Sequence, residues 1–219
     1  MRAVRIVFLF FVSLNAVAQT PGFRFGPRIG FGMSDFSKLP GERNKNVFAL
    51  QIGLMACKQL NENFAVEVCP QVATYGSRSD GIEQNGVTKS MAPALYSFHD
   101  DFRVGVVEFP FFAKYSVPIN KIYVNAFAGP EICMNMFGAH SRTYDDKQYN
   151  FDHGFSGYSI KDLNDRCYAA VLGFGAEKEI GKGFLGLDMR LQYPLSPSGK
   201  IEMSRFYVQA GTLGITWTH

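Results

Sequence analysis

Outside its first twenty residues the sequence has no long apolar run, and it has few charges, one tryptophan and four cysteines. A membrane-spanning helix needs about 18 or more consecutive apolar residues, so no transmembrane helix is expected in the rest of the chain. The cysteines, at 57, 69, 133 and 167, follow no zinc-binding spacing. The formal net charge is only +3, and this balance gives no reason to expect nucleic acid as a partner.

Phenylalanine, tyrosine and glycine are abundant instead. The 219 residues include 21 Phe, 10 Tyr and 22 Gly, and charged residues make up 19% of the chain. Aromatic residues favour strands, whereas glycine suits tight turns and closely packed backbones. The length suits one domain, or a signal segment followed by one domain. The composition therefore predicts a single all-β domain.

The N-terminus has the pattern of a secretory signal peptide. A basic start precedes a short apolar core and the small-x-small sequence Ala-Val-Ala. Cleavage is expected between Ala18 and Gln19, which gives a signal peptide over 1–18 and a barrel domain over 19–219. The alternative, a membrane anchor, is disfavoured because the apolar core is too short to span a bilayer.

The mature sequence alternates between apolar and polar residues in eight runs, at 23–34, 47–58, 64–76, 103–115, 122–137, 166–178, 184–195 and 205–218. These lengths suit tilted strands that cross a membrane. Short connections alternate strictly with longer polar ones, as in outer-membrane barrels with tight periplasmic turns and long extracellular loops. The pattern predicts an eight-stranded antiparallel transmembrane β-barrel, an up-and-down meander with both termini on the periplasmic side.

Each run has an apolar face and a polar face. In the hairpin over 106–137, Phe109, Phe111, Val124 and Ile132 share one face, and the charged residues lie on the other. A soluble lipocalin-like ligand-binding barrel is the alternative, but it would place its charges outside, and these charges are too few to cover a water-facing surface. We expect the apolar face to meet outer-membrane lipid. The lumen is then predicted to be filled by a structural network of Arg24, Arg28, Glu67, Glu108, Lys114, Glu131, Glu177, Asp188 and Arg190.

Two details of the strands are left open by the pattern. Four prolines, at 27, 70, 110 and 130, fall inside predicted strands, where each removes a ladder hydrogen bond. Export to an oxidising space permits a disulfide between Cys133 and Cys167, while unpaired thiols packed among other side chains explain the same residues.

Several segments together resemble a known family. GPRIGFGMS, FAVEVCPQVATYG, VVEFPFFAKY, YVNAFAGPEI, VLGFGAEKEIGKGFLGLDMRLQY and LGITW occur in the order typical of the PorT-like outer-membrane β-barrel family. The resemblance covers the mature chain and implies an eight-stranded barrel in a Gram-negative outer membrane. The namesake of the family is linked to a protein secretion system. The positions that match are Glu108, Pro110, Gly129, Pro130, Gly173, Gly175, Asp188 and Arg190, and they imply architecture and no known chemistry.

The expected role is non-enzymatic: a structural, adhesion or secretion/assembly component that acts through extracellular loops. The connections 77–102 and 138–165 are the expected contact regions for a protein partner, because the second intersperses aromatic with acidic residues. No cofactor or metal is expected, since the acidic residues follow no EF-hand order. The enzymatic alternative is a lipid-modifying activity at a loop Ser/His pair, drawn from His140, Ser141, His153 and Ser156, with Asp145 or Asp146 to orient the base.

Overall fold

The structure is a computed structural model that describes residues 22–37, 43–84, 95–145, 156–159, 163–201 and 204–219. The predicted signal peptide lies outside the described residues. The described strands are β1 (Phe23–Ser37), β2 (Arg43–Gln59), β3 (Phe64–Val68), β4 (Gln71–Gln84), β5 (Leu95–Ile119), β6 (Ile122–Tyr144), β7 (Ser156–Ser159), β8 (Arg166–Ile180), β9 (Gly183–Pro194), β10 (Gly199–Ile201) and β11 (Ser204–Thr218). In the part of the chain that is described, no helix is long and apolar enough to cross a membrane.

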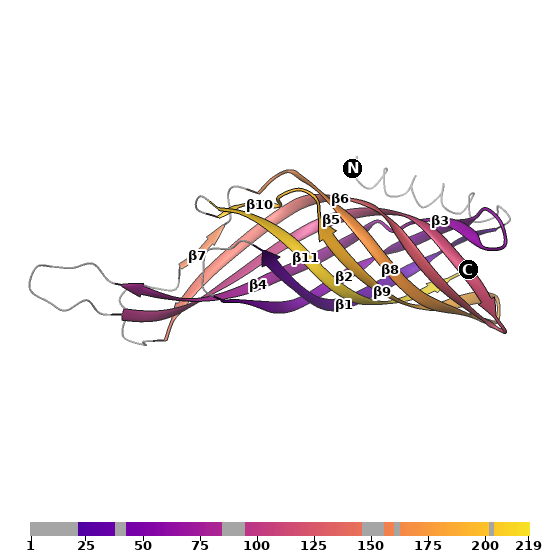
Figure 1. The fold of residues 1–219 in the computed structure, drawn as a ribbon, viewed down its shortest axis with the longest axis horizontal. Coiled ribbons are helices and arrows are strands. Elements are labelled where there is room, and N and C mark those ends of the chain that lie inside the picture. The colour runs from indigo at the N-terminus through magenta and orange to yellow at the C-terminus, as the bar shows by residue number, and fades with distance from the viewer. Residues whose placement is uncertain (1–21, 38–42, 85–94, 146–155, 160–162, 202–203) are drawn as a thin grey trace, which may run out of the picture.

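The strands form one closed antiparallel barrel (Figure 1). Around the ring the order is β1, β2, β3 with β4, β5, β6, β8, β9 and β11, and the pairing of β1 with β11 closes it. β3 and β4 occupy one position in the ring, so the barrel has eight strand positions. The predicted eight-stranded meander is therefore confirmed. We call the end with the short turns and the C-terminus the turn end, and the opposite end the loop end.

The prolines explain where the ladder is interrupted. The strand expected over 64–76 is split between β3 and β4 at Pro70, which has no N–H; its carbonyl still accepts a 3.0 Å bond from Leu54 N. Pro110 and Pro130 flank a gap in which the β5–β6 bridges skip from Pro110–Glu131 to Ala113–Ala128. The register is the same on both sides of the gap, so the barrel stays closed.

The strands at the loop end are longer than their sequence predicts. β4 continues to Gln84 and β5 starts at Leu95, so most of the predicted connection 77–102 is paired sheet. β6 continues to Tyr144, and the short strands β7 and β10 lie inside the predicted connections 138–165 and 196–204. The prediction of loops there was wrong because it relied on apolar alternation. A hairpin outside the membrane keeps its backbone hydrogen bonds without an apolar face.

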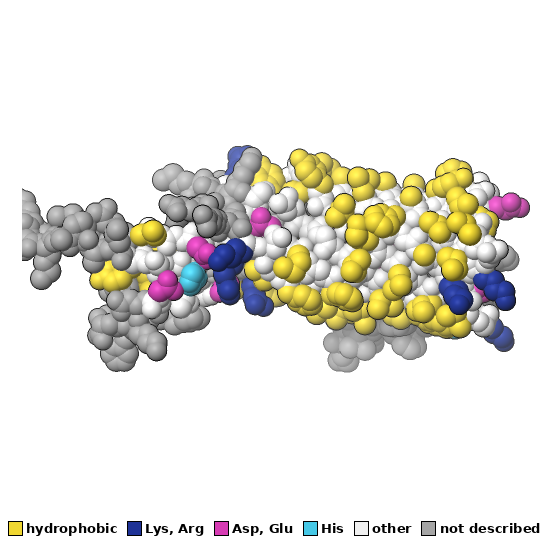
Figure 2. Space-filling view, turned by 60° about the horizontal axis from the view of Figure 1, so that its bottom comes forward, with side chains coloured by type: hydrophobic (Ala, Val, Ile, Leu, Met, Phe, Trp, Pro, Cys, Tyr) yellow, Lys and Arg dark blue, Asp and Glu magenta, His cyan; other side chains and the backbone are white. Residues whose placement is uncertain are grey.

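The two faces of the barrel differ sharply in exposure. Ile29 is 51% exposed on the outer face, whereas its neighbour Arg28 is 1% exposed in the lumen. Likewise, Phe111 on the outer face is 43% exposed, whereas Lys114 in the lumen is 2% exposed. Hydrophobic side chains cover the body of the barrel in Figure 2, and the charged side chains visible there gather at its two ends. This is the surface of a protein that is solvated by lipid along its middle and by water at its ends.

Side chains fill the lumen in layers. Near the loop end the inward residues are apolar, a layer made of Phe36, Ala49, Ala73, Tyr75, Phe102, Val104, Val106, Phe206, Val208 and Ala210. A smaller apolar group, Phe112, Phe127 and Val171, lies nearer the turn end. The buried charges lie around and between these groups. The apolar layer closes the lumen towards the loop end.

Candidate functional site

Arg28 is the most enclosed cation of the lumen. Its guanidinium makes two bonds to Asp188, Nη2 to Oδ1 at 2.7 Å and Nε to Oδ2 at 3.1 Å. Nη1 also donates to Gln51 at 2.9 Å and to Gln71 at 3.2 Å. The paired, fork-like geometry is the strong form of an arginine–carboxylate contact. Glycines on both sides leave room for it, because a Cβ on Gly214 would lie 2.3 Å from Nη2.

Starting with Arg28 and Asp188, a connected series of ion pairs runs to the turn end, and we call it the lumen ion chain. Arg190 Nε lies 2.9 Å from Asp188 Oδ1, and its Nη2 lies 3.1 Å from Glu67 Oε1. Lys114 Nζ lies 3.5 Å from Glu67 Oε2 and also pairs with Glu177. Glu177 in turn pairs with Arg24, whose Nη1 lies 2.8 Å from Oε2. The lumen ion chain thus holds four cations and three carboxylates, which leaves one positive charge in excess. It brings together seven of the nine predicted network residues.

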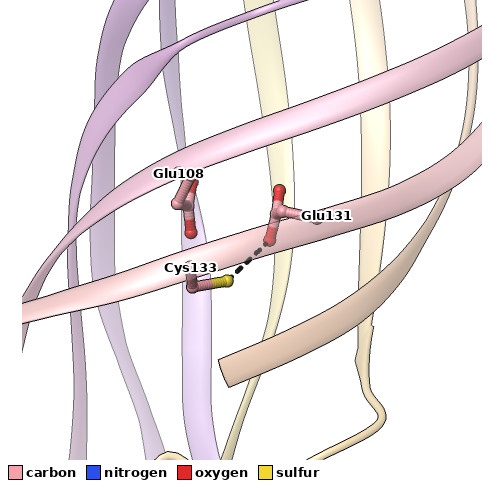
Figure 3. Close-up of side chains that lie close together, drawn as sticks. All are labelled: Glu108, Glu131 and Cys133. Atoms are coloured by element: carbon pink, nitrogen blue, oxygen red, sulfur yellow. Dashed lines mark hydrogen bonds between the residues drawn. The ribbon is translucent and has the colours of Figure 1, made fainter. Parts of the chain in front are cut away.

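Glu108 and Glu131 form a separate acidic pair next to Cys133 (Figure 3). Among the described residues neither glutamate takes part in an ion pair; Glu108 instead accepts hydrogen bonds from Tyr75 at 2.6 Å and from Gln71 at 2.7 Å. Gln192 Nε2 donates to both glutamates, and Cys133 Sγ lies 3.3 Å from Glu131. One carboxylate oxygen of each glutamate and the sulfur of Cys133 lie within 4.8 Å of one another. Neutral donors thus occupy the positions around this pair that cations hold elsewhere in the lumen.

Sequence reasoning missed the neutral members of this arrangement. Gln51, Gln71, Gln192 and Tyr75 link the acidic pair to Arg28, because Gln71 accepts from Arg28 and donates to Glu108. Their signal was present, since each lies at a position of its strand that alternates with lipid-facing apolar residues. Restricting the predicted network to charged residues left them out.

The cysteines are buried thiols in this structure. Cys133 and Cys167 are directly opposite each other on β6 and β8, and Cys167 Sγ lies 3.7 Å from the carbonyl oxygen of Cys133. Both side chains face the lumen, with 4% and 6% exposure. Of the two alternatives that the sequence left open, the structure has the unpaired thiols.

At the loop end, beyond the apolar band, charged residues hold the extended sheet together. Arg142 makes bonds of 2.8 and 2.9 Å to the two oxygens of Asp100, and His140 Nε2 lies 3.1 Å from Asp100. Burial by itself raises the pKa of the Asp100 carboxyl, but the bonds from Arg142 and His140 outweigh burial and hold this pKa below its usual value. The ring of His140 stacks on Phe102 at 4.4 Å.

A second cluster lies farther out on the same sheet. Asp80 pairs with Lys45 on β2 and, at 2.8 Å, with His99 on β5. The hydrogen bond from Lys45, followed by that from His99, lowers the pKa of Asp80. The other ring nitrogen of His99 lies 3.0 Å from Asp145. Cross-strand ion pairs thus link β2, β4 and β5 outside the apolar band.

The described residues of the alternative catalytic set, His140, Ser141 and Asp145, do not form a triad. His140 and Ser141 are consecutive in β6, and successive side chains of a strand point to opposite faces. Asp145 contacts His99 rather than His140. Asp146 and His153 lie outside the described residues, and Ser156 begins β7. Among the described members of this set, no nucleophile contacts a base as such a site requires.

A closed barrel with an apolar outer band and a polar, filled lumen is the architecture of small outer-membrane proteins. The family model described as outer membrane protein beta-barrel domain matches residues 17–199. The chain belongs to this family. It is therefore a β-barrel protein of the cell outer membrane, and in this family the turn end is periplasmic and the loop end extracellular.

Solved structures with a similar fold are distant in sequence. Neisserial surface protein A is 13% identical over 90% of this chain and 96% of its own, with a TM-score of 0.45. Another is Ail, the attachment invasion locus protein of Yersinia pestis, solved with the heparin analogue sucrose octasulfate. It is 11% identical over 90% of this chain and 99% of its own, with a TM-score of 0.39. Outer Membrane Protein W of E. coli is 12% identical over 86% of this chain and 96% of its own, with a TM-score of 0.30. No curated protein shows significant sequence similarity to this chain.

Proposed function

We propose that this barrel is a non-enzymatic component of the outer membrane that acts through its extracellular sheet, in adhesion, in secretion or assembly, or as a structural element. The observation that carries the proposal is the extension of β4, β5 and β6 beyond the apolar band. A barrel that served only to span the membrane has no need of these extra paired residues. Among the described residues, the apolar layer that closes the lumen leaves no route for transport through the barrel.

The extended sheet has the properties of a preformed contact surface. Ion pairs between strands fix it, so binding need not order a flexible loop. It also carries exposed apolar area, since Ile82 near the tip of β4 is 60% exposed. A protein partner is therefore proposed to contact the described parts of 77–102 and 138–165. The nine lumen charges are proposed to rigidify the barrel that presents this sheet.

Photo-cross-linking in intact cells tests the proposal. A photoreactive amino acid replaces Ile82 on the extracellular sheet, and a matched control replaces Ile180, which is 42% exposed at the periplasmic end of β8. We expect the first variant to give a discrete cross-linked species after illumination that the control does not give. Ser97, which pairs with Ile82 across β4 and β5, provides a second position for the photoreactive residue. If cross-linking at both positions yields only the free protein, the extracellular role is wrong.

The absence of catalysis is part of the same proposal, supported by the opposite faces of His140 and Ser141. Purified protein incubated with labelled phospholipid or lipid A should release no fatty acid. Release that disappears in Ser141→Ala would overturn this part of the proposal.

Two finer assignments also rest on the sequence. We propose cleavage between Ala18 and Gln19, so the mass of the protein from outer membranes should correspond to a chain that starts at Gln19. We further propose a PorT-like member of the family, supported by the order of the matching segments. A deletion strain should then secrete less protein into the medium, and unchanged secretion would contradict the link.

A further inference from the structure

The lumen is hollow at its periplasmic end. A cavity of about 530 Å³ lies inside the mouth of the barrel, lined among others by Arg24, Ser116, Pro118, Tyr123, Glu177 and Phe184. These residues come from β1, β5, β6, β8 and β9, so the cavity is enclosed by strands on several sides. Pockets that hold small molecules have volumes of about 300–1,000 Å³, and barrel mouths are among their usual positions. The volume is thus sufficient for a small ligand.

The wall of this mouth cavity is largely apolar and aromatic. Tyr123 and Phe184 pack edge to face with ring centroids 6.0 Å apart, and Phe23 and Pro118 add apolar surface. Rings in this arrangement offer area for a flat or extended apolar group at little entropic cost. A purely polar ligand would leave this surface without a partner.

Arg24 is the one cation in the described wall of the mouth cavity, which also holds the carboxylates of Glu177 and Glu62. Arg24 is 15% exposed there, with its guanidinium carbon 4.5 Å above the ring of Phe184 and Nη1 2.8 Å from Glu177. Glu177 is shared with Lys114, so two cations compete for one carboxylate at the inner end of the cavity. The unpaired carboxylates, Glu108 and Glu131, lie farther towards the extracellular side. Arg24 is the cation that ends the lumen ion chain on the periplasmic side.

We infer that the periplasmic mouth is a binding pocket for a small amphipathic anion, whose carboxylate meets Arg24 and whose apolar body lies against Tyr123 and Phe184. A guanidinium with free N–H groups is suited to a carboxylate, and the contact is strengthened by the partial exclusion of water. Glu62 is exposed at the rim of the cavity, where water and salt screen its charge. The inference is independent of the extracellular role.

Nuclear magnetic resonance of the mature protein in phosphatidylcholine nanodiscs tests the inference. The probe is 4-phenylbutyrate, and 4-phenylbutylamine and 4-phenylbutanol are matched probes with a positive and no charge. We expect saturable shifts of the amides of Ser116, Tyr123 and Phe184 with the carboxylate. The amine and the alcohol should bind at least about tenfold more weakly, because they lose the charge-assisted bond to Arg24.

Variants separate the pocket from the rest of the barrel. Pro118→Trp fills the cavity from an exposed position without removing a member of an ion pair, and Lys121→Trp adds the same ring in the adjacent turn outside the cavity. We expect Pro118→Trp and Arg24→Met each to weaken the carboxylate about tenfold or more, and Lys121→Trp to leave its affinity unchanged. If Arg24→Met does not fold, Pro118→Trp and the comparison of the three probes still test the inference. Equal binding of the three probes, or full affinity in Pro118→Trp, would overturn the inference.

Discussion

At the scale of single residues, parity along the strand decides the environment of a side chain. Arg28 and Ile29 are neighbours in sequence, yet one is enclosed by hydrogen-bond partners and the other faces lipid. A buried cation that keeps all its partners can be accommodated, whereas removing one partner leaves an uncompensated charge. The stability of the barrel should therefore respond far more to the inner face than to the outer one.

Replacing Arg28 by leucine should destabilise the barrel by about 3–5 kcal/mol, because Asp188 then remains buried without its main partner. The double variant Arg28→Leu/Asp188→Leu should lose less than the sum of the single variants. Urea unfolding in lipid vesicles measures both, and Ile29→Leu on the outer face is the control. Additive losses would show that the two residues are not coupled.

Gly214 should tolerate no side chain. A Cβ there would lie 2.3 Å from Arg28 Nη2 and 2.7 Å from its Cζ, and the bonded guanidinium has little room to move. Gly214→Ala should cost about 1–3 kcal/mol, the usual cost of overpacking. On the same strand a Cβ at Gly211 would meet only Leu191 Cδ2 at 3.5 Å, so Gly211→Ala should be nearly neutral. Equal unfolding midpoints for the two variants would contradict this packing.

At the scale of elements, the extracellular sheet differs from the strands within the membrane. The membrane strands are fixed by lipid outside and by packed side chains inside. The extension of β4, β5 and β6 depends more on cross-strand ion pairs such as Arg142 with Asp100 and Lys45 with Asp80. Its order should consequently depend on pH, while that of the barrel should not change over the same range.

The direction of this pH dependence follows from the carboxylates. The pKa values of Asp80 and Asp100 are lowered in the folded state, so their ionised forms stabilise the sheet above the pKa of an unfolded aspartate, about 3.9. This contribution is lost as the pH falls below about 4 through the folded values. Between pH 7 and pH 3, amide resonances of 96–102 and 139–144 should broaden or shift, and those of Gly173 and Gly175 should not.

Asp100→Asn provides the matched variant for the acid experiment. The amide cannot pair electrostatically with Arg142, so part of the same change should be present already at pH 7. An extension that stays unchanged in this variant, and in the native protein at pH 3, would show that backbone pairing alone is sufficient to order it.

At the scale of the whole molecule, the barrel is a filled cylinder. The apolar layer at the extracellular end and the lumen ion chain below it occupy the cross-section, and the mouth cavity lies at the periplasmic end. Purified protein should give no stable unitary conductance in planar lipid bilayers, while it shows heat-modifiable migration on gels as folded barrels do. Reproducible channel openings from folded protein would contradict a closed lumen.

The sequence was sufficient for the number of strand positions, the face of each residue and the membrane setting. The reason is physical: a period of two assigns Glu108 and Phe111 to opposite faces whatever the rest of the chain does. It was not sufficient for the length of β4, β5 and β6 beyond the membrane, because paired polar strands and polar loops have the same composition there. The sequence likewise shows the prolines inside the strands, but it does not predict the gap in the pairing of β5 with β6.

Which lumen residues touch each other was decided by the tertiary structure alone. Arg28 meets Asp188, 160 residues away, because barrel closure and the stagger of β1, β11 and β9 bring them to one level. The same stagger places Glu108 and Glu131 beside Gln192 rather than beside a cation. Alternation along a strand determines only that a side chain points inward. Its neighbours across the lumen depend on how every strand in the ring is tilted and shifted.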